Sequence, residues 1–217
     1  MDQLTFKFPF KANYFEEDFY VSANNFEAYK LIETWPKWSS RFINIFGPSG
    51  CGKTHLANIF KKKISSFFIK ATDLNNNSLS LIKLKECFII DEYQNNVDEK
   101  LFYSILNQCY LSNQYIIINS LKPIQNFKIK LNDLRSRFVS FVNIGIDLPT
   151  DELIKVIISK NFSDKQVKID NKLLDYILKN IDRSYEGIFD LIDKLDNLSL
   201  STGKPININL IKKVLIK

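Results

Sequence analysis

The sequence predicts an α/β protein in which a five-stranded parallel sheet of the P-loop NTPase type is followed by a small all-helical lid. Three observations predict this. Short apolar runs alternate with helical patterns up to about residue 148, as in parallel sheets with helical crossovers. No strand pattern follows Pro149. A glycine-rich phosphate-binding motif, residues 47–54, lies between the first predicted strand and the next helix.

The apolar spacing places the elements of the α/β part in order. Residues 1–40 form an aromatic-rich arm with a helical stretch at 25–33. Strands are expected at 41–46, 66–71, 87–90, 115–118 and 141–146, and helices at 53–63 and 101–111. The polar run 73–78 is expected to be a loop. The strand at 87–90 is continuously apolar, which is typical of a parallel strand buried on both faces.

The remaining chain carries only helical patterns. Thr150 can cap a helix through 153–157, and apolar residues at helical spacing predict further helices at 173–181, 188–198 and 210–216. We therefore divide the chain into a short amino-terminal peptide, a nucleotide-binding domain and a helical lid, at residues 1–12, 13–148 and 149–217.

Composition excludes several classes of protein. The 217 residues are 45% hydrophobic and 25% charged, and no apolar run approaches the roughly 18 residues of a membrane span. Three cysteines and one histidine form no disulfide framework or zinc spacing, which indicates a reducing cytoplasm. The net charge of +6 comes mostly from lysines spread along the chain, which favours a solvated face over a specific nucleic-acid stripe. Without a signal peptide, the mature protein is expected to begin near Met1.

The glycine-rich motif predicts a site for ADP or ATP with Mg²⁺. Gly50 and Gly52 let backbone amides and the helix N-terminus point at phosphates, Lys53 reaches the β/γ-phosphates, and the Thr54 hydroxyl can ligate the metal. Cys51 is interpreted as a bystander rather than a redox switch. The expected phosphate-binding residues are Gly47, Pro48, Ser49, Gly50, Cys51, Gly52, Lys53 and Thr54.

Two later strands supply the acidic and polar partners of this loop. Asp91 and Glu92 follow an apolar strand about forty residues after the motif, as in a Walker B element. Asp91 is placed to hold the metal through water, and Glu92 is the candidate catalytic group that polarises an attacking water. Asn119, near the end of the next strand, is the sensor 1 candidate for the γ-phosphate.

These motifs together resemble the AAA+ ATPases, and several residues resemble the DnaA branch from about residue 13 to 217. His55 follows the motif directly, as it does in that branch. The resemblance implies that Phe19, Val21, Asn25 and His55 belong to the nucleotide site, the first three beside the adenine. Leu134-Arg-Ser-Arg137-Phe138 is similar to box VII, with Arg137 as a catalytic arginine finger. Arg183-Ser-Tyr-Glu-Gly187 is similar to sensor 2.

Within this branch the chain resembles the Hda family of DnaA-related regulators. It ends at Lys217, just past the last predicted lid helix, so we expect no DNA-reading helix-turn-helix domain. Trp35-Pro-Lys-Trp38 is similar to the alphaproteobacterial form. The amino terminus resembles the peptide by which such proteins dock on the β sliding clamp, with alternate side chains filling an apolar groove: Gln3, Leu4, Phe6 and Phe8.

The resemblance implies a negative regulator that binds the clamp on DNA and promotes hydrolysis of ATP held by DnaA. Arg137 would act in trans, while the chain's own nucleotide, usually ADP in this family, would set its conformation. Self-association into a homo-oligomer is expected. Two departures bear on the site: Leu121 stands where DnaA has an acidic residue, and Arg135 lies beside Arg137. The alternatives are a helicase loader of the DnaC type and an initiator fragment that binds DNA.

Overall fold

The computed structural model describes residues 14–95, 97–165, 167, 169–203 and 205–215. The described chain forms two compact units, Tyr14–Asp147 and a helical unit that begins at Leu148. The predicted clamp-binding peptide, residues 1–12, lies outside the described residues.

The first unit is built on a five-stranded parallel sheet, as the sequence predicts. The strands are β1 (Phe42–Phe46), β2 (Ser66–Lys70), β3 (Cys87–Tyr93), β4 (Tyr115–Ser120) and β5 (Val142–Gly145). Their order across the sheet is β2-β3-β4-β1-β5, and every neighbouring pair is parallel. All carboxyl ends therefore meet at one edge, where open α/β sheets bind ligands.

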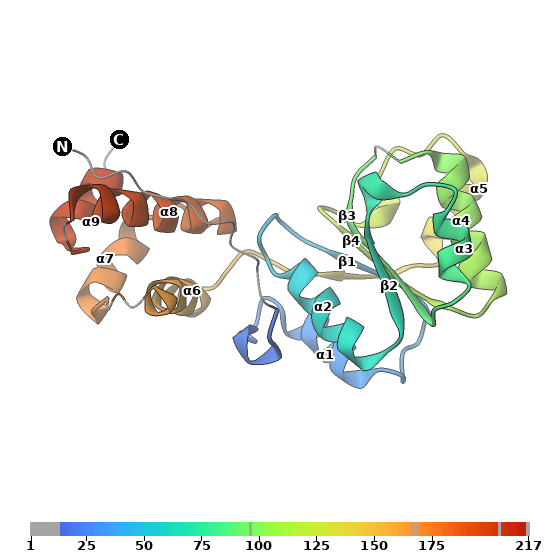
Figure 1. The fold of residues 1–217 in the computed structure, drawn as a ribbon, viewed down its shortest axis with the longest axis horizontal. Coiled ribbons are helices and arrows are strands. Elements are labelled where there is room, and N and C mark those ends of the chain that lie inside the picture. Colours follow the sequence, from blue (N-terminus) through green and yellow to red (C-terminus); the bar gives the residue numbers. More distant parts are fainter. Residues whose placement is uncertain (1–13, 96, 166, 168, 204, 216–217) are drawn as a thin grey trace. The chain divides into compact units, whose positions relative to one another are not determined.

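Helices cover both faces of this sheet (Figure 1). Helices α1 (Phe26–Thr34) and α2 (Lys53–Lys63) lie on one face, and α3 (Ser78–Ile82), α4 (Glu99–Leu111) and α5 (Asn132–Val139) on the other. Short 3-10 turns occur at Glu16–Asp18, Ala71–Asp73 and Ile124–Asn126. Phe88 and Ile90 face the second helical layer and share a core with Phe102 of α4 and Phe138 of α5.

Several boundaries differ from the predicted ones. Strand β3 runs three residues beyond its predicted end, because Tyr93 is buried and its ring packs 4.9 Å from that of Phe102. Asp91 and Glu92 therefore lie inside β3 rather than after it. Helix α4 begins two residues early because the Asp98 side chain accepts the backbone N–H groups of residues 100 and 101. Helices α3 and α5 were not predicted.

The helical unit contains α6 (Asp151–Asp164), α7 (Asn171–Asn180), α8 (Tyr185–Thr202) and α9 (Ile208–Leu215). Thr150, Asp170 and Ser184 cap the first three, each accepting a backbone N–H of the first turn. The helices bury a common apolar core that includes Ile158, Ile177 and Leu195. Within the described ranges, no helix combines the length and apolar character needed to cross a bilayer.

Candidate nucleotide-binding site

The phosphate-binding loop connects β1 to α2, and two of its glycines cannot be replaced without a shift. A Cβ on Gly47 would lie 2.5 Å from the backbone oxygen of Ile146, and one on Gly52 would lie 3.0 Å from the Phe19 ring. Gly52 also has a φ of 98°, which side chains with a Cβ rarely adopt. Helix α2 begins at the next residue, Lys53, so the unpaired N–H groups of its first turn lie at the end of this loop.

The Lys53 side chain lies along the loop. Its Nζ donates hydrogen bonds to the backbone oxygens of Gly47 at 2.8 Å and Pro48 at 2.7 Å. The buried Cys51 sulfur lies 3.6 Å from the same ammonium group. Burial raises the pKa of the Cys51 thiol even though Lys53 acts in the opposite direction, so the thiol stays protonated at neutral pH. This supports a structural role for Cys51.

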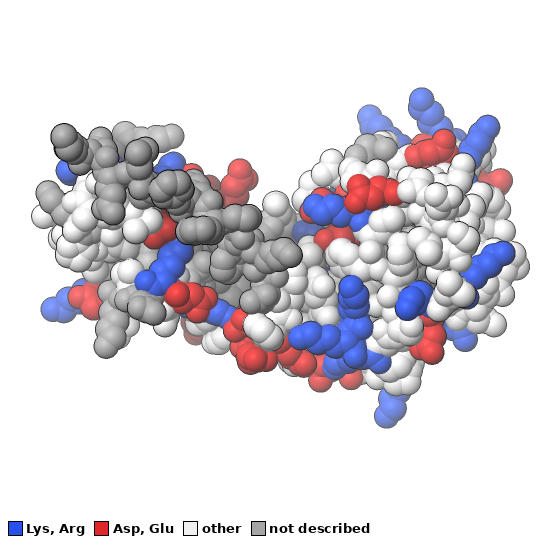
Figure 2. Space-filling model, viewed as in Figure 1, with Lys and Arg blue, Asp and Glu red and all other residues white. Residues whose placement is uncertain are grey.

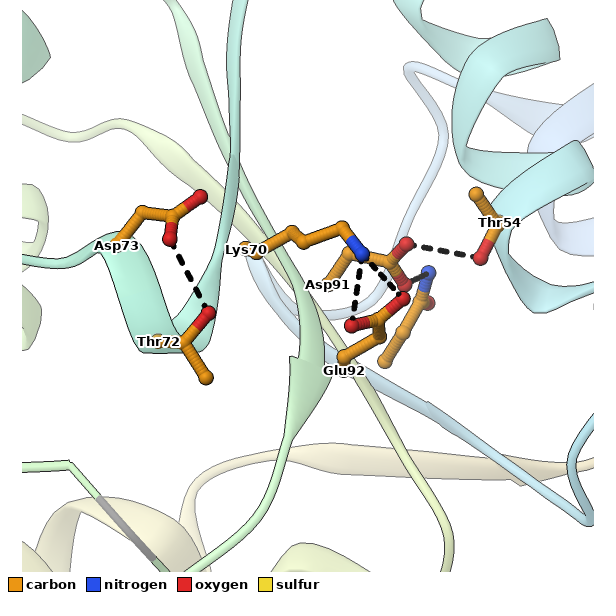
Figure 3. A network of polar contacts seen from close by, with 7 residues as sticks. Thr54, Lys70, Thr72, Asp73, Asp91 and Glu92 are labelled. Atoms are coloured by element: carbon orange, nitrogen blue, oxygen red, sulfur yellow. Dashed lines mark hydrogen bonds and ion pairs between the residues drawn. The ribbon is translucent and has the colours of Figure 1, made fainter. Parts of the chain in front are cut away.

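Thr54, Asp91 and Asn119 form a chain of hydrogen bonds across three elements. The Thr54 hydroxyl at the start of α2 donates to Asp91 Oδ2 at 2.8 Å (Figure 3). The Asn119 amide nitrogen on β4 donates to Asp91 Oδ1, also at 2.8 Å. Asp91 and Asn119 are 2% and 0% exposed. The structure thus joins the predicted Walker A hydroxyl, Walker B carboxylate and sensor 1 amide.

These residues fit a nucleoside phosphate with Mg²⁺. A hydroxyl and a carboxylate are the hard oxygen ligands that Mg²⁺ prefers. The Oδ1 atom of Asn119 is buried and has no hydrogen-bond partner among the residues described. Such an atom destabilises the fold unless something satisfies it, which makes it a polar contact point beside Asp91. The close approaches at Gly47 and Gly52 explain why this loop has glycine at both positions.

Glu92 has a different environment from Asp91, although the two are neighbours in β3. Its backbone has a φ of 55°, in the left-handed region, and the strand pairing shifts between Ile90 and Tyr93. The Lys70 ammonium binds both oxygens of its carboxylate, at 2.9 and 3.0 Å (Figure 3). This hydrogen-bonded pair raises the pKa of Lys70, so the lysine is charged at neutral pH. The candidate catalytic carboxylate therefore has a local ion-pair partner.

Sequence reasoning missed Lys70. Strand pairing places it directly opposite Asp91, at the carboxyl end of the neighbouring strand β2. The only available signal was a lysine at the end of a predicted strand, and lysines are frequent in this chain. Strand order was needed to identify its partner.

Two of the predicted nucleotide-site residues, Phe19 and His55, lie together at the start of α2. The Phe19 ring lies 5.3 Å from the His55 ring, edge to face, and stacks 5.9 Å from Tyr29 of α1. Asn25 is buried and closes the preceding loop, because its Oδ1 accepts the backbone N–H of Ser22 and its Nδ2 donates to the oxygen of Tyr20. The half-buried Val21 lies within this closed loop.

Arg137 and Arg135 both lie on α5 but have different partners. Arg137 is half-buried and donates from Nη2 to Asn107 Oδ1 at 2.8 Å. Arg135 is exposed and donates to the backbone oxygen of Ile129 at 2.7 Å. Leu134 and Phe138 anchor the helix in the core. The two candidate guanidinium groups therefore have different hydrogen-bond partners and different exposure.

Arg183, the predicted sensor 2 residue, lies in the helical unit just before α8. It forms an ion pair with Asp151 at the start of α6, with a shortest distance of 3.2 Å, and its side chain is 60% exposed. Gly187 is required nearby, because a Cβ there would lie 2.8 Å from the backbone oxygen of Asp182. Gln3, Leu4, Phe6 and Phe8 lie outside the described residues.

Comparison with family models gives two partial matches. Residues 151–215 match the model for the Hda lid domain, and residues 43–122 match a model described as RNA helicase. The second range spans the phosphate-binding loop and Asp91. Each match covers less than half of the chain.

Relatives and solved structures point to DnaA. The chromosomal replication initiator DnaA of Treponema denticola is 25% identical over 205 residues, covering 82% of this chain and 44% of the relative. The chain spans about half the length of the curated relatives it matches. Domain III of Thermotoga maritima DnaA superposes with a TM-score of 0.76 at 20% identity, covering 96% of this chain and 98% of that one.

A further structure, of DnaA bound to AMPPCP and single-stranded DNA, superposes with a TM-score of 0.68 at 23% identity. It covers 86% of this chain and 65% of that chain. The parallel sheet, the phosphate-binding loop, the buried carboxylate and the helical lid agree with these similarities. The chain is therefore a DnaA-related AAA+ protein, with a P-loop NTPase fold and a helical lid domain.

Proposed function

We propose that this protein is a negative regulator of replication initiation that promotes hydrolysis of ATP bound to DnaA. The observation that carries the proposal is the match of residues 151–215 to the Hda lid domain, on a chain related to DnaA. The protein would act in the cytoplasm, docked through Gln3, Leu4, Phe6 and Phe8 on the β sliding clamp on DNA, and would assemble into a homo-oligomer.

The protein's own nucleotide, ADP or ATP with Mg²⁺, would be regulatory. Lys53 and the loop amides would bind the phosphates. Phe19, Val21 and Asn25 would lie beside the adenine, with His55 also in the nucleotide site. Arg183 would report the nucleotide to the lid. Bound Mg²⁺ would neutralise phosphate charge, with Thr54 and Asp91 as its protein ligands. Asn119 keeps the Asp91 carboxylate oriented through its 2.8 Å hydrogen bond. The ion pair with Lys70 would lower the rate of the chain's own hydrolysis by holding Glu92.

Arg137 would supply the catalytic charge in trans. An arginine contributed by a neighbouring molecule stabilises charge on the transferred phosphoryl group, an effect worth about 10³- to 10⁵-fold in rate. We choose Arg137 rather than Arg135 because Arg137 matches the finger position of the box VII motif. Arg135 donates to a backbone oxygen six residues earlier in its own chain.

The test follows ATP bound to DnaA from the same organism. Clamp-loaded DNA is present, and the protein is added or omitted. We expect faster hydrolysis that requires both the clamp and the amino-terminal peptide, so that the double variant Gln3→Ala, Leu4→Ala loses it while binding nucleotide normally. Phe10→Ala, outside the predicted contact residues, is the matched control. No acceleration by the folded wild-type protein would contradict the proposal.

A second candidate function is direct binding of single-stranded DNA, which is favoured by the similarity to a DnaA that binds it. The charge distribution argues against a strong site on the visible face, because Lys and Arg side chains there are spread among acidic and neutral ones (Figure 2). Measuring the protein's affinity for a labelled single-stranded oligonucleotide at 50 and 200 mM salt tests this second candidate function. An affinity that falls about 10³-fold or more over this range indicates an extensive phosphate contact surface.

A further inference from the structure

The Arg137 guanidinium rests on two side chains of the neighbouring helix α4. Its Nη2 donates to Asn107 Oδ1 at 2.8 Å, and its Cζ lies 4.4 Å from the centre of the Tyr110 ring. Residues three apart on a helix share one face, so α4 presents an acceptor and an aromatic ring side by side. Both contacts fix the orientation of a long side chain that is only half-buried.

We propose that Asn107 and Tyr110 are positioning residues for Arg137, which hold its guanidinium at the surface in the orientation offered to a partner's nucleotide. This inference rests on the proposed function, in which Arg137 acts in trans. A guanidinium has five N–H donors, and the bond to Asn107 takes one of them, which leaves four for phosphoryl oxygens.

The neutrality of both partners matters as much as their geometry. An amide oxygen and an aromatic ring bind the guanidinium without cancelling its charge. Arg183 shows the opposite arrangement, because the Asp151 carboxylate pairs with it. A charge that must stabilise a phosphoryl group is best held by neutral groups, since these orient it and leave its field intact.

Tyr110 also has enough exposure to face a second molecule. Tyr110 is 53% exposed, and the adjacent Leu111 is 70% exposed. Direct contact with a partner is therefore the competing explanation for any effect of Tyr110. Leu111 provides a matched control for it, because it also lies at the end of α4 and is exposed.

The first experiment examines the isolated protein by NMR of the arginine Nε–Hε groups. In Tyr110→Leu, the Arg137 signal should lose its ring-current shift and its order parameter should fall. Tyr110→Phe keeps the ring and should keep the signal, while Asn107→Leu should increase mobility alone. An unchanged Arg137 signal in Tyr110→Leu would overturn the inference. The experiment requires no partner protein.

The second experiment measures hydrolysis of DnaA-bound ATP with clamp-loaded DNA. Tyr110→Leu should lower the maximal stimulated rate about tenfold at an unchanged half-saturating concentration, because misplacing a catalytic group lowers the rate rather than binding. Tyr110→Phe should restore the rate, and Leu111→Ala should match wild type. In an Arg137→Ala background, Tyr110→Leu should have no further effect.

The possible failures are distinct. A wild-type rate in Tyr110→Leu, with Arg137→Ala inactive, would overturn the positioning role alone. A further loss from Tyr110→Leu in the Arg137→Ala background would show direct partner contact instead. A wild-type rate in Arg137→Ala would refute the proposed action of Arg137 in trans, and the positioning role would fall with it.

Discussion

Replacing Lys70 with methionine tests whether an ion pair restrains the protein's own candidate catalytic carboxylate. Lys70 binds both oxygens of Glu92, at 2.9 and 3.0 Å, and methionine keeps an unbranched stem while removing the charge. The two side chains are 51% and 52% exposed. Because exposed ion pairs contribute only about 0.2–1 kcal/mol, we expect the free energy of unfolding to fall by less than about 1 kcal/mol.

The same free energy limits the gain in hydrolysis. If Glu92 polarises water only when it is unpaired, releasing it from an interaction of about 0.2–1 kcal/mol raises its unpaired fraction about 1.4- to 5-fold. Single-turnover hydrolysis of ATP by the isolated protein should therefore be faster in Lys70→Met by up to about fivefold. The effect should disappear in the double variant Lys70→Met, Glu92→Gln.

Lys85→Met is the matched control. Lys85 is another lysine of the same unit, and its ammonium group donates to the Ser65 hydroxyl at 3.5 Å rather than pairing with a carboxylate among the described residues. It should match wild type in turnover. Unchanged or slower turnover in Lys70→Met, with Glu92→Gln still impaired, would refute the restraining role. Slower turnover would indicate that Lys70 acts on the nucleotide rather than on Glu92.

Three further predictions concern the loop and the sheet edge. Lys53→Met should weaken binding of ADP and ATP by at least about tenfold, as measured by calorimetry, because an ammonium–phosphate contact is lost; wild-type affinity would contradict the phosphate-binding assignment. Gly47→Ala should lower the free energy of unfolding by about 1–3 kcal/mol in urea titrations, because its Cβ would lie 2.5 Å from the Ile146 oxygen; no change would show that the loop relaxes. Hydrogen bonds from two backbone N–H groups lower the pKa of Glu99 from its ordinary value of 4.5. Glu99→Gln should therefore lower the free energy of unfolding above pH 4.5, and the difference from wild type should vanish as the pH falls through the lowered pKa. A difference in unfolding free energy that grows in acid would contradict this prediction.

The parts of the site that sequence predicted best depend on residues close together in the chain. The phosphate-binding loop is continuous, and its glycines, lysine and threonine have fixed spacing. Asp91 was recognised because the apolar run before it is typical of a buried parallel strand. The five-stranded parallel sheet followed from the alternation of strands and helices.

The parts that were missed depend on contacts between distant residues. The length of β3 was underestimated because burial of Tyr93 against Phe102 and Phe138 continues the strand past two carboxylates. Helix α5 has only two buried residues, Leu134 and Phe138, which is too weak a periodic signal in eight residues.

The partners of the two candidate catalytic groups were also missed. Lys70 reaches Glu92 only through the pairing of β2 with β3, and Asn107 reaches Arg137 only through the packing of α4 against α5. Neither pairing can be read from local spacing. Sequence therefore named the candidate chemical groups, and the structure identified the side chains that contact them.

The most direct test of the central claim compares Arg137→Ala with Arg135→Ala in the hydrolysis of DnaA-bound ATP on clamp-loaded DNA. Both variants remove one guanidinium from α5, so they are matched in charge and helix. We predict that Arg137→Ala loses stimulation by about 10³-fold or more while retaining clamp binding, and that Arg135→Ala stays close to wild type. Full stimulation by Arg137→Ala would contradict the account.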